Sequence, residues 1–77
     1  MSTLTKERSV LVDDFMESYV SWREACEDVR RAYRRWLEST PHQRHLGFAT
    51  YRAALDREEH AAGVHSQTAE RLAAVAT

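Results

Sequence analysis

The chain has 77 residues, a formal net charge of −1 at pH 7 and one cysteine. This length allows one small domain, and a single cysteine excludes an internal disulfide. No apolar run approaches the ~20 residues of a membrane span, and residues 1–15 have neither the apolar run nor the cleavage site of a signal peptide. We therefore expect one cytoplasmic domain over residues 1–77.

Ten of the eleven basic residues are arginine, and alanine is abundant. This bias fits a GC-rich bacterial genome and does not require phosphate recognition. A domain of this size buries only ~60% of its unfolded surface and usually needs a disulfide, a structural metal or a partner chain. Because no disulfide or zinc-finger spacing occurs in the sequence, we expect oligomerisation to complete the core.

The first predicted element is a helix over about residues 10–38. Its apolar positions step alternately by three and four residues, which is an unbroken heptad pattern. No glycine or proline interrupts residues 1–40, and Thr3, Thr5 and Ser9 are candidate N-caps. The row predicts the broad apolar face of a bundle helix. It consists of Val12, Phe15, Tyr19, Trp22, Cys26, Val29, Tyr33 and Trp36.

Residues 39–41 form the predicted turn. Pro41 disfavours helix at Thr40 and is favoured in the first turn of a new helix. With Thr40 as N-cap, Gln43 takes the third helical position and completes a Thr-x-x-Gln capping box. The second helix is therefore expected over about residues 41–74.

A second heptad row follows in this helix, with a flank of small residues. The row is Phe48, Tyr51, Leu55, Glu58, Ala62, His65, Ala69, Leu72 and Ala76, and the flank is Gly47, Ala54, Ala61 and Thr68. We expect bulky side chains of the first helix to pack against small ones of the second. Gly63 weakens a helix by ~1 kcal/mol relative to alanine, so a kink or fraying is predicted at residues 63–66.

The sequence therefore predicts an all-α antiparallel two-helix hairpin. Its register brings Trp22 near Glu58 and Phe15 near His65. Since one partner helix cannot cover such wide apolar faces, we expect a homodimer forming a four-helix bundle, or a core completed on another helical protein. The predicted interface and core seam is Val12, Phe15, Tyr19, Trp22, Cys26, Val29, Tyr33, Trp36, Phe48, Tyr51, Leu55, Ala62 and Leu72.

Charge is strongly polarised along the hairpin. Residues 30–52 hold six arginines against Glu38 and carry a net charge of +5, while the rest of the chain carries −6. Two hairpins with tips at opposite ends would pair basic with acidic surface, and we favour this hypothesis. Alternatively, the tip binds an anionic partner such as nucleic acid, with His42 and His45 adding charge at lower pH. This candidate patch is Arg30, Arg31, Arg34, Arg35, Arg44 and Arg52.

Three polar or reactive residues in the heptad rows are candidate sites, and each has a structural interpretation that we favour. Glu58 is expected to pair with Arg23 or Arg57, or to lie at the edge of the bundle, and to fix the register. His65 is expected to be hydrogen-bonded near the open end. Without a Glu-x-x-His motif, metal binding is not predicted. Cys26 has no histidine at its level and is interpreted as a buried small hydrophobe.

Secreted bacterial helical hairpins of the WXG type are similar in length and in having two helices, but carry Trp-x-Gly in the turn. Here Trp36-Leu37-Glu38 lies in the first helix, so we do not assign the chain to that family. We predict a non-enzymatic protein–protein interaction module with no cofactor, membrane partner or small-molecule ligand. The alternative is a nucleic-acid-associated regulator that uses the basic tip.

Overall fold

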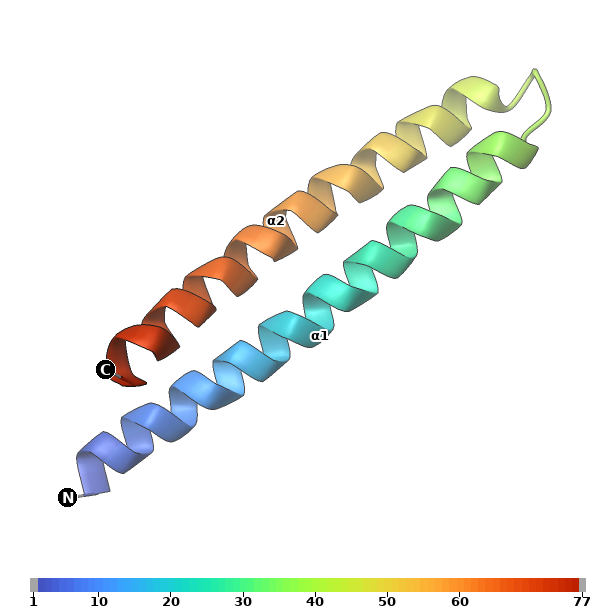
Figure 1. Cartoon of the computed structure of the whole chain (residues 1–77). Helices are drawn as coiled ribbons and strands as arrows, with labels where there is room; N and C mark the ends of the chain where they lie inside the picture. Colours follow the sequence, from blue (N-terminus) through green and yellow to red (C-terminus); the bar gives the residue numbers. More distant parts are fainter. Residues whose placement is uncertain (1, 77) are drawn as a thin grey trace.

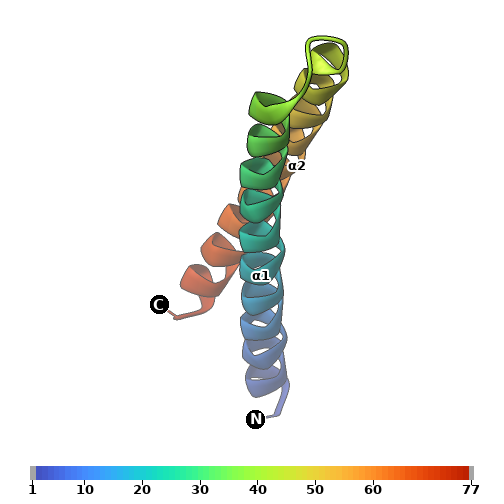
Figure 2. The same ribbon diagram turned by 90° about the vertical axis from the view of Figure 1, so that its right-hand side faces the viewer.

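The computed structural model describes the backbone of residues 2–76 and the side chains of residues 6–75. Two helices, α1 (Ser2–Glu38) and α2 (Arg44–Ala76), make up nearly all of this part of the chain, which contains no strand. They run antiparallel and side by side over most of their length (Figure 1). A view turned by 90° shows that the helices cross at a shallow angle (Figure 2). The all-α, two-helix prediction is confirmed.

The hairpin is a rod. Its principal extents are 63 × 13 × 13 Å, and its radius of gyration is 17.6 Å. A compact domain of the same length would have a radius of gyration of about 11 Å. Because a rod of two helices has no third element to cover it, only the line where the helices meet is enclosed within one chain.

Helix α1 starts earlier than predicted, at Ser2 instead of about residue 10. Thr3, Thr5 and Ser9 all lie inside it, so their expected N-cap role is wrong. No glycine or proline separates this segment from the heptad row, and a helix once formed propagates through residues of moderate propensity. The helix ends at Glu38 as predicted, where the backbone N–H and the hydroxyl of Ser39 both donate to the carbonyl of Trp36, at 3.2 and 2.6 Å.

The connection between the helices is longer than predicted, and α2 begins at Arg44 instead of about residue 41. The backbone N–H of Gln43 donates to the Thr40 carbonyl at 2.9 Å, which closes a β-turn with Pro41 at its favoured second position. Since this N–H is used by a carbonyl, the predicted capping box with the Thr40 hydroxyl is wrong. The Gln43 carbonyl then accepts from Gly47 at 2.9 Å and opens α2.

The centre of the helix–helix contact is a line of small side chains on both helices. Those that the structure buries are Ser18, Ala25 and Ala32 of α1 and Ala54 and Thr68 of α2. They recur every seventh residue or a multiple of it, so they follow one stripe on each helix. The expected packing of large side chains into small ones is therefore wrong at the centre, where small meets small. Short side chains let two helices approach closely, and the bulky ones are placed beside the contact line.

The two glycines of α2 have opposite surroundings. A Cβ atom built at Gly47 would lie 3.3 Å from the Cα of Trp36 and 3.4 Å from its ring, whereas one at Gly63 would meet nothing within 4 Å. Gly47 is thus part of the close approach near the turn. Helix α2 runs without a break through Gly63, so the predicted fraying at residues 63–66 is wrong, while the kink stays a prediction.

These surroundings predict that the same substitution has different effects at the two glycines. Gly63→Ala should stabilise the fold by up to ~1 kcal/mol, because alanine favours helix and meets open space. Gly47→Ala should give no gain or a loss, since Trp36 must shift to accept the new methyl group. Urea unfolding at one protein concentration measures both variants, and equal stabilisation would contradict the close contact at Gly47.

Candidate protein interaction surface

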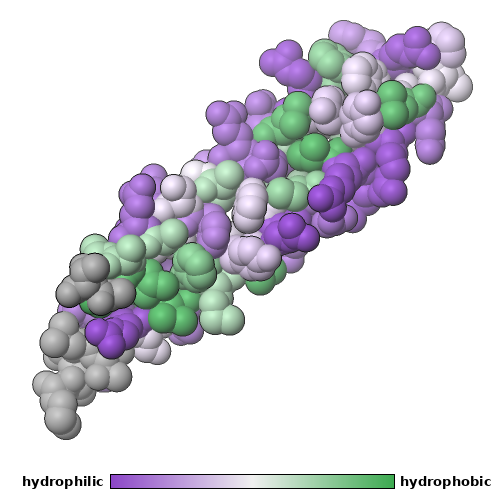
Figure 3. Space-filling view, viewed as in Figure 1, coloured by the Kyte–Doolittle hydropathy of each residue, from purple (hydrophilic) through white to green (hydrophobic). Residues whose placement is uncertain are grey.

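The residues of the two predicted heptad rows lie on one side of the hairpin, here called the aromatic face. Side chains of one row contact those of the other across the helix pair, and heptad spacing keeps the intervening members on the same side. Hydrophobic and near-neutral residues run along the line between the helices, with hydrophilic residues on both flanks (Figure 3). From Phe15 to Leu72, the aromatic face comprises Phe15, Tyr19, Trp22, Cys26, Val29, Tyr33, Trp36, Phe48, Tyr51, Leu55, Glu58, Ala62, His65, Ala69 and Leu72.

Near the turn, four aromatic rings form the tip cluster: Tyr33, Trp36, Phe48 and Tyr51. The ring centroid of Trp36 lies 5.1 Å from that of Phe48 and 5.5 Å from that of Tyr51, with which it is stacked. Tyr33 is 5.4 Å from Tyr51. These contacts join the two helices beside the small residues at the centre.

Toward the termini, Phe15, Tyr19, Trp22 and His65 form the open-end cluster. The His65 ring lies between those of Phe15, at 4.8 Å, and Trp22, at 5.7 Å and nearly parallel. The predicted proximity of Phe15 to His65 is thereby confirmed. Tyr19 also packs on His65, at 5.6 Å. One imidazole of α2 therefore organises three aromatic side chains of α1.

Beneath this cluster lies a buried hydroxyl pair. The Ser18 Oγ is 2.7 Å from Thr68 Oγ1 and 2.9 Å from His65 Nδ1, and Thr68 Oγ1 donates to the His65 carbonyl at 2.8 Å. Each hydroxyl has a single hydrogen. Ser18 Oγ also donates to the Phe15 carbonyl at 2.9 Å, so these contacts share the single hydrogens of the two hydroxyls and the imidazole hydrogen. Ser18 thus joins α1 to both Thr68 and His65 of α2.

The sequence interpretation missed Ser18, although it named Thr68 as a flanking residue. The signal was present, because Ser18, Ala25 and Ala32 repeat at seven-residue intervals like the aromatic row. It was overlooked because the larger side chains were assigned to the helix–helix contact. The expected hydrogen bonding of His65 is confirmed.

Glu58 bonds to a ring and not to an arginine. The indole N–H of Trp22 donates to Glu58 Oε2 at 3.0 Å. This bond confirms the predicted register and corrects the expected pairing of Glu58 with Arg23 or Arg57. A carboxylate at this position satisfies the polar end of a half-buried tryptophan.

Much of the aromatic face stays exposed in the single chain. Tyr19 is 46% exposed, Tyr33 43% and Phe48 40%, and none of the described large side chains is fully buried. Tyr33 belongs to the predicted interface and core seam, and one chain alone does not bury it. Val12 and Leu55 are also exposed, while the other predicted seam residues are half-buried: Phe15, Trp22, Cys26, Val29, Trp36, Tyr51, Ala62 and Leu72.

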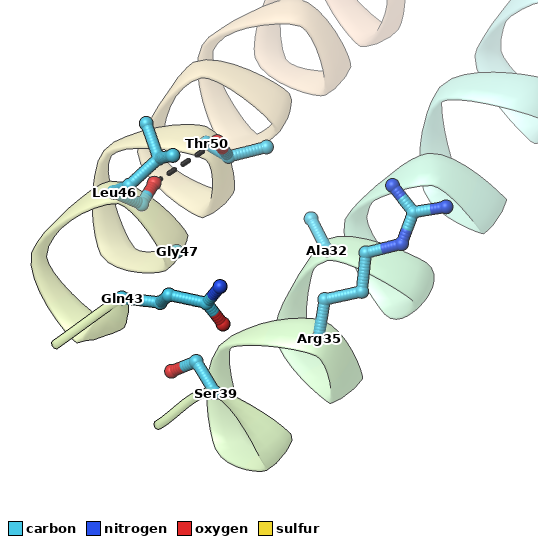
Figure 4. Close-up of a pocket in the computed structure, with 7 residues that line it drawn as sticks. All are labelled: Ala32, Arg35, Ser39, Gln43, Leu46, Gly47 and Thr50. Carbon is cyan, nitrogen blue, oxygen red and sulfur yellow. Dashed lines mark hydrogen bonds between the residues drawn. The ribbon is translucent and has the colours of Figure 1, made fainter. Parts of the chain in front are cut away.

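The opposite side of the hairpin carries open grooves, in which polar residues alternate with the exposed Leu46 and Val64. One of about 210 Å³ lies near the turn and is lined by Ala32, Arg35, Ser39, Gln43, Leu46, Gly47 and Thr50. In Figure 4, Ser39 and Gln43 reach into the space between the helices beside Gly47. The hydroxyls of Ser39 and Thr50 already bond to backbone carbonyls, so they are committed to the fold.

The six tip arginines divide into two groups. Arg30 pairs with Glu27 at 2.7 Å and Arg31 pairs with Asp28, both within one turn of helix. Within residues 6–75, no ion pair forms at the other four, which are exposed: Arg34, Arg35, Arg44 and Arg52. The positive charge of the tip is thus only partly compensated within the chain.

Among the described residues, no three histidine, cysteine or acidic side chains gather closely enough to hold a metal ion. Likewise, neither helix is long and apolar enough over its described residues to cross a membrane. Neither protein-family models, nor curated proteins, nor solved structures match the chain. The aromatic face, with its two clusters, is the candidate functional surface.

The hydroxyl pair predicts a strong coupling between two substitutions. Ser18→Ala or Thr68→Val alone should each cost about 0.5–1.5 kcal/mol, because the remaining buried hydroxyl loses one of its hydrogen-bond partners. The double variant should cost less than the sum, since both polar groups leave together. Urea unfolding of the four proteins at one concentration measures the coupling, and strictly additive losses would contradict the bond between Ser18 and Thr68.

Proposed function

We propose that this protein is a non-enzymatic interaction module of the cytoplasm that self-associates through its aromatic face into a four-helix bundle. One observation carries the proposal: large aromatic side chains line one side of a two-helix rod, and Tyr19, Tyr33 and Phe48 among them remain more than a third exposed. Monomeric proteins rarely expose such contiguous apolar surface without a binding role. Aromatic residues are also the ones enriched in the cores of protein interfaces.

The exposed area supports the same conclusion. The chain exposes 6128 Å², about 1,300 Å² more than expected for a compact protein of 8.9 kDa. A standard interface buries ~800 Å² on each partner. Covering the aromatic face with another pair of helices would therefore bring the exposed area close to that of an ordinary folded protein.

The chemistry of the aromatic face suits a helical partner. Its aromatic clusters and the smaller Cys26, Val29 and Leu55 between them form a continuous stripe along both helices. A stripe of this length matches another long helix pair better than a loop or a strand edge. A second copy supplies such a pair, and a larger helical protein that completes the core is the other form of the proposal.

A matched pair of substitutions tests the role of the aromatic face. Leu55 lies on it and is 36% exposed, whereas Val64 is 39% exposed and lines a polar groove with Asp14, Ser21 and Arg71. Leu55→Lys should weaken self-association at least tenfold, because burying leucine contributes ~1.5–3 kcal/mol. Val64→Lys should leave it unchanged. Sedimentation velocity over a concentration series measures both dissociation constants.

Circular dichroism of the two variants serves as the control for helix content. If both variants stay helical and dissociate equally, the aromatic face is not the interface. If the wild-type protein is a folded monomer at every concentration, self-association is ruled out. If the protein is a monomer on its own and forms a complex only with an added helical protein, that protein completes the core in place of a second copy.

Nucleic-acid binding is the second candidate function, and the four arginines without ion pairs favour it. Such binding should weaken steeply with salt, because each phosphate contact releases a counterion. Fluorescence anisotropy with a labelled DNA duplex tests this candidate, with the dissociation constant measured from about 50 to about 200 mM salt. Absence of binding at the lowest salt would exclude this candidate.

A further inference from the structure

We infer, on the basis of the proposed function, that the aromatic face is covered by a second copy running in the opposite direction, so that the tip cluster of each chain packs on the open-end cluster of its partner. The alternative dimer packs the same two faces with both tips at one end. Charge distinguishes these two arrangements, and the spacing of the clusters makes the opposed one self-complementary.

The spacing is symmetric about Cys26. In the row of α1 that runs Val12, Tyr19, Cys26, Tyr33, the two tyrosines each stand seven residues from Cys26, about 10.5 Å at 1.5 Å per residue. Tyr19 belongs to the open-end cluster and Tyr33 to the tip cluster. A two-fold axis perpendicular to the rod near Cys26 therefore places Tyr19 of each chain opposite Tyr33 of the other. The interface is then self-complementary.

Charge favours this direction over the alternative. With the axis near Cys26, the basic tip, net +5, covers residues 8–22 and 62–70 of the partner. These residues hold Arg8 against four acidic residues, a net charge of −3. In the alternative dimer, the two tips, each +5, would meet. In both arrangements, the acidic middle of the rod faces the same segment of the partner. The two dimers therefore differ in charge pairing mainly at the tips.

The arrangement is tested by distances between spin labels, measured by pulsed electron paramagnetic resonance. The tip label is placed at the exposed His42 through His42→Cys in a Cys26→Ala background. The reference label is placed at the exposed Arg57 through Arg57→Cys in the same background. Arg57 stands near the level of Cys26, so its two copies should be close in either dimer. Sedimentation of both labelled variants controls for retained self-association.

Opposed directions predict a tip-to-tip distance of at least about 36 Å, since some twelve helical residues separate the tip from the axis on each side at 1.5 Å each. The alternative dimer predicts less than about 30 Å, because packed helix axes lie 8–10 Å apart. A short tip distance would overturn the inference and leave the proposed self-association intact. Absence of dipolar coupling at both positions, with a monomer by sedimentation, would overturn both.

Discussion

The close contact between two stripes of small side chains determines how everything else in this molecule is arranged. Ser18, Ala25 and Ala32 of α1 lie against Ala54 and Thr68 of α2, and these are the buried residues of the hairpin. Side chains of this size leave room for nothing bulky between the helices. The aromatic residues, one or four positions after a small residue of the stripe in each heptad, therefore lie together on one side. The close contact thus creates both the stability of the hairpin and the exposed aromatic face.

The two faces of the hairpin follow from this arrangement and set its chemistry. On one side, the hydroxyls of Ser39 and Thr50 near the turn are committed to backbone carbonyls. The other carries two aromatic clusters, one organised by Trp36 and one by His65. A pair of helices encloses too little volume to bury such rings, so their burial requires further helices. We propose that a second copy provides them.

Sequence periodicity predicted the helices, the antiparallel hairpin and the pairing of Trp22 with Glu58, because heptad spacing and a short turn constrain these features directly. It did not predict which stripe forms the contact. Apolar size was taken as the sign of burial, whereas close packing selects small side chains, serine and threonine included. The turn was misjudged for a local reason: Thr40 offers both a hydroxyl and a carbonyl to the N–H of Gln43, and the carbonyl accepts. The exposure of Tyr33 depends on the number of chains, which periodicity does not give.

The central claim is that one chain leaves the aromatic face uncovered and a second copy covers it. Light scattering coupled to size-exclusion chromatography measures the molar mass of the untagged protein at micromolar concentration. The account predicts twice the 8.9 kDa of the chain, with full helical content. A folded, helical monomer of 8.9 kDa at all concentrations would contradict it, because the exposed clusters would then be stable in water without a partner.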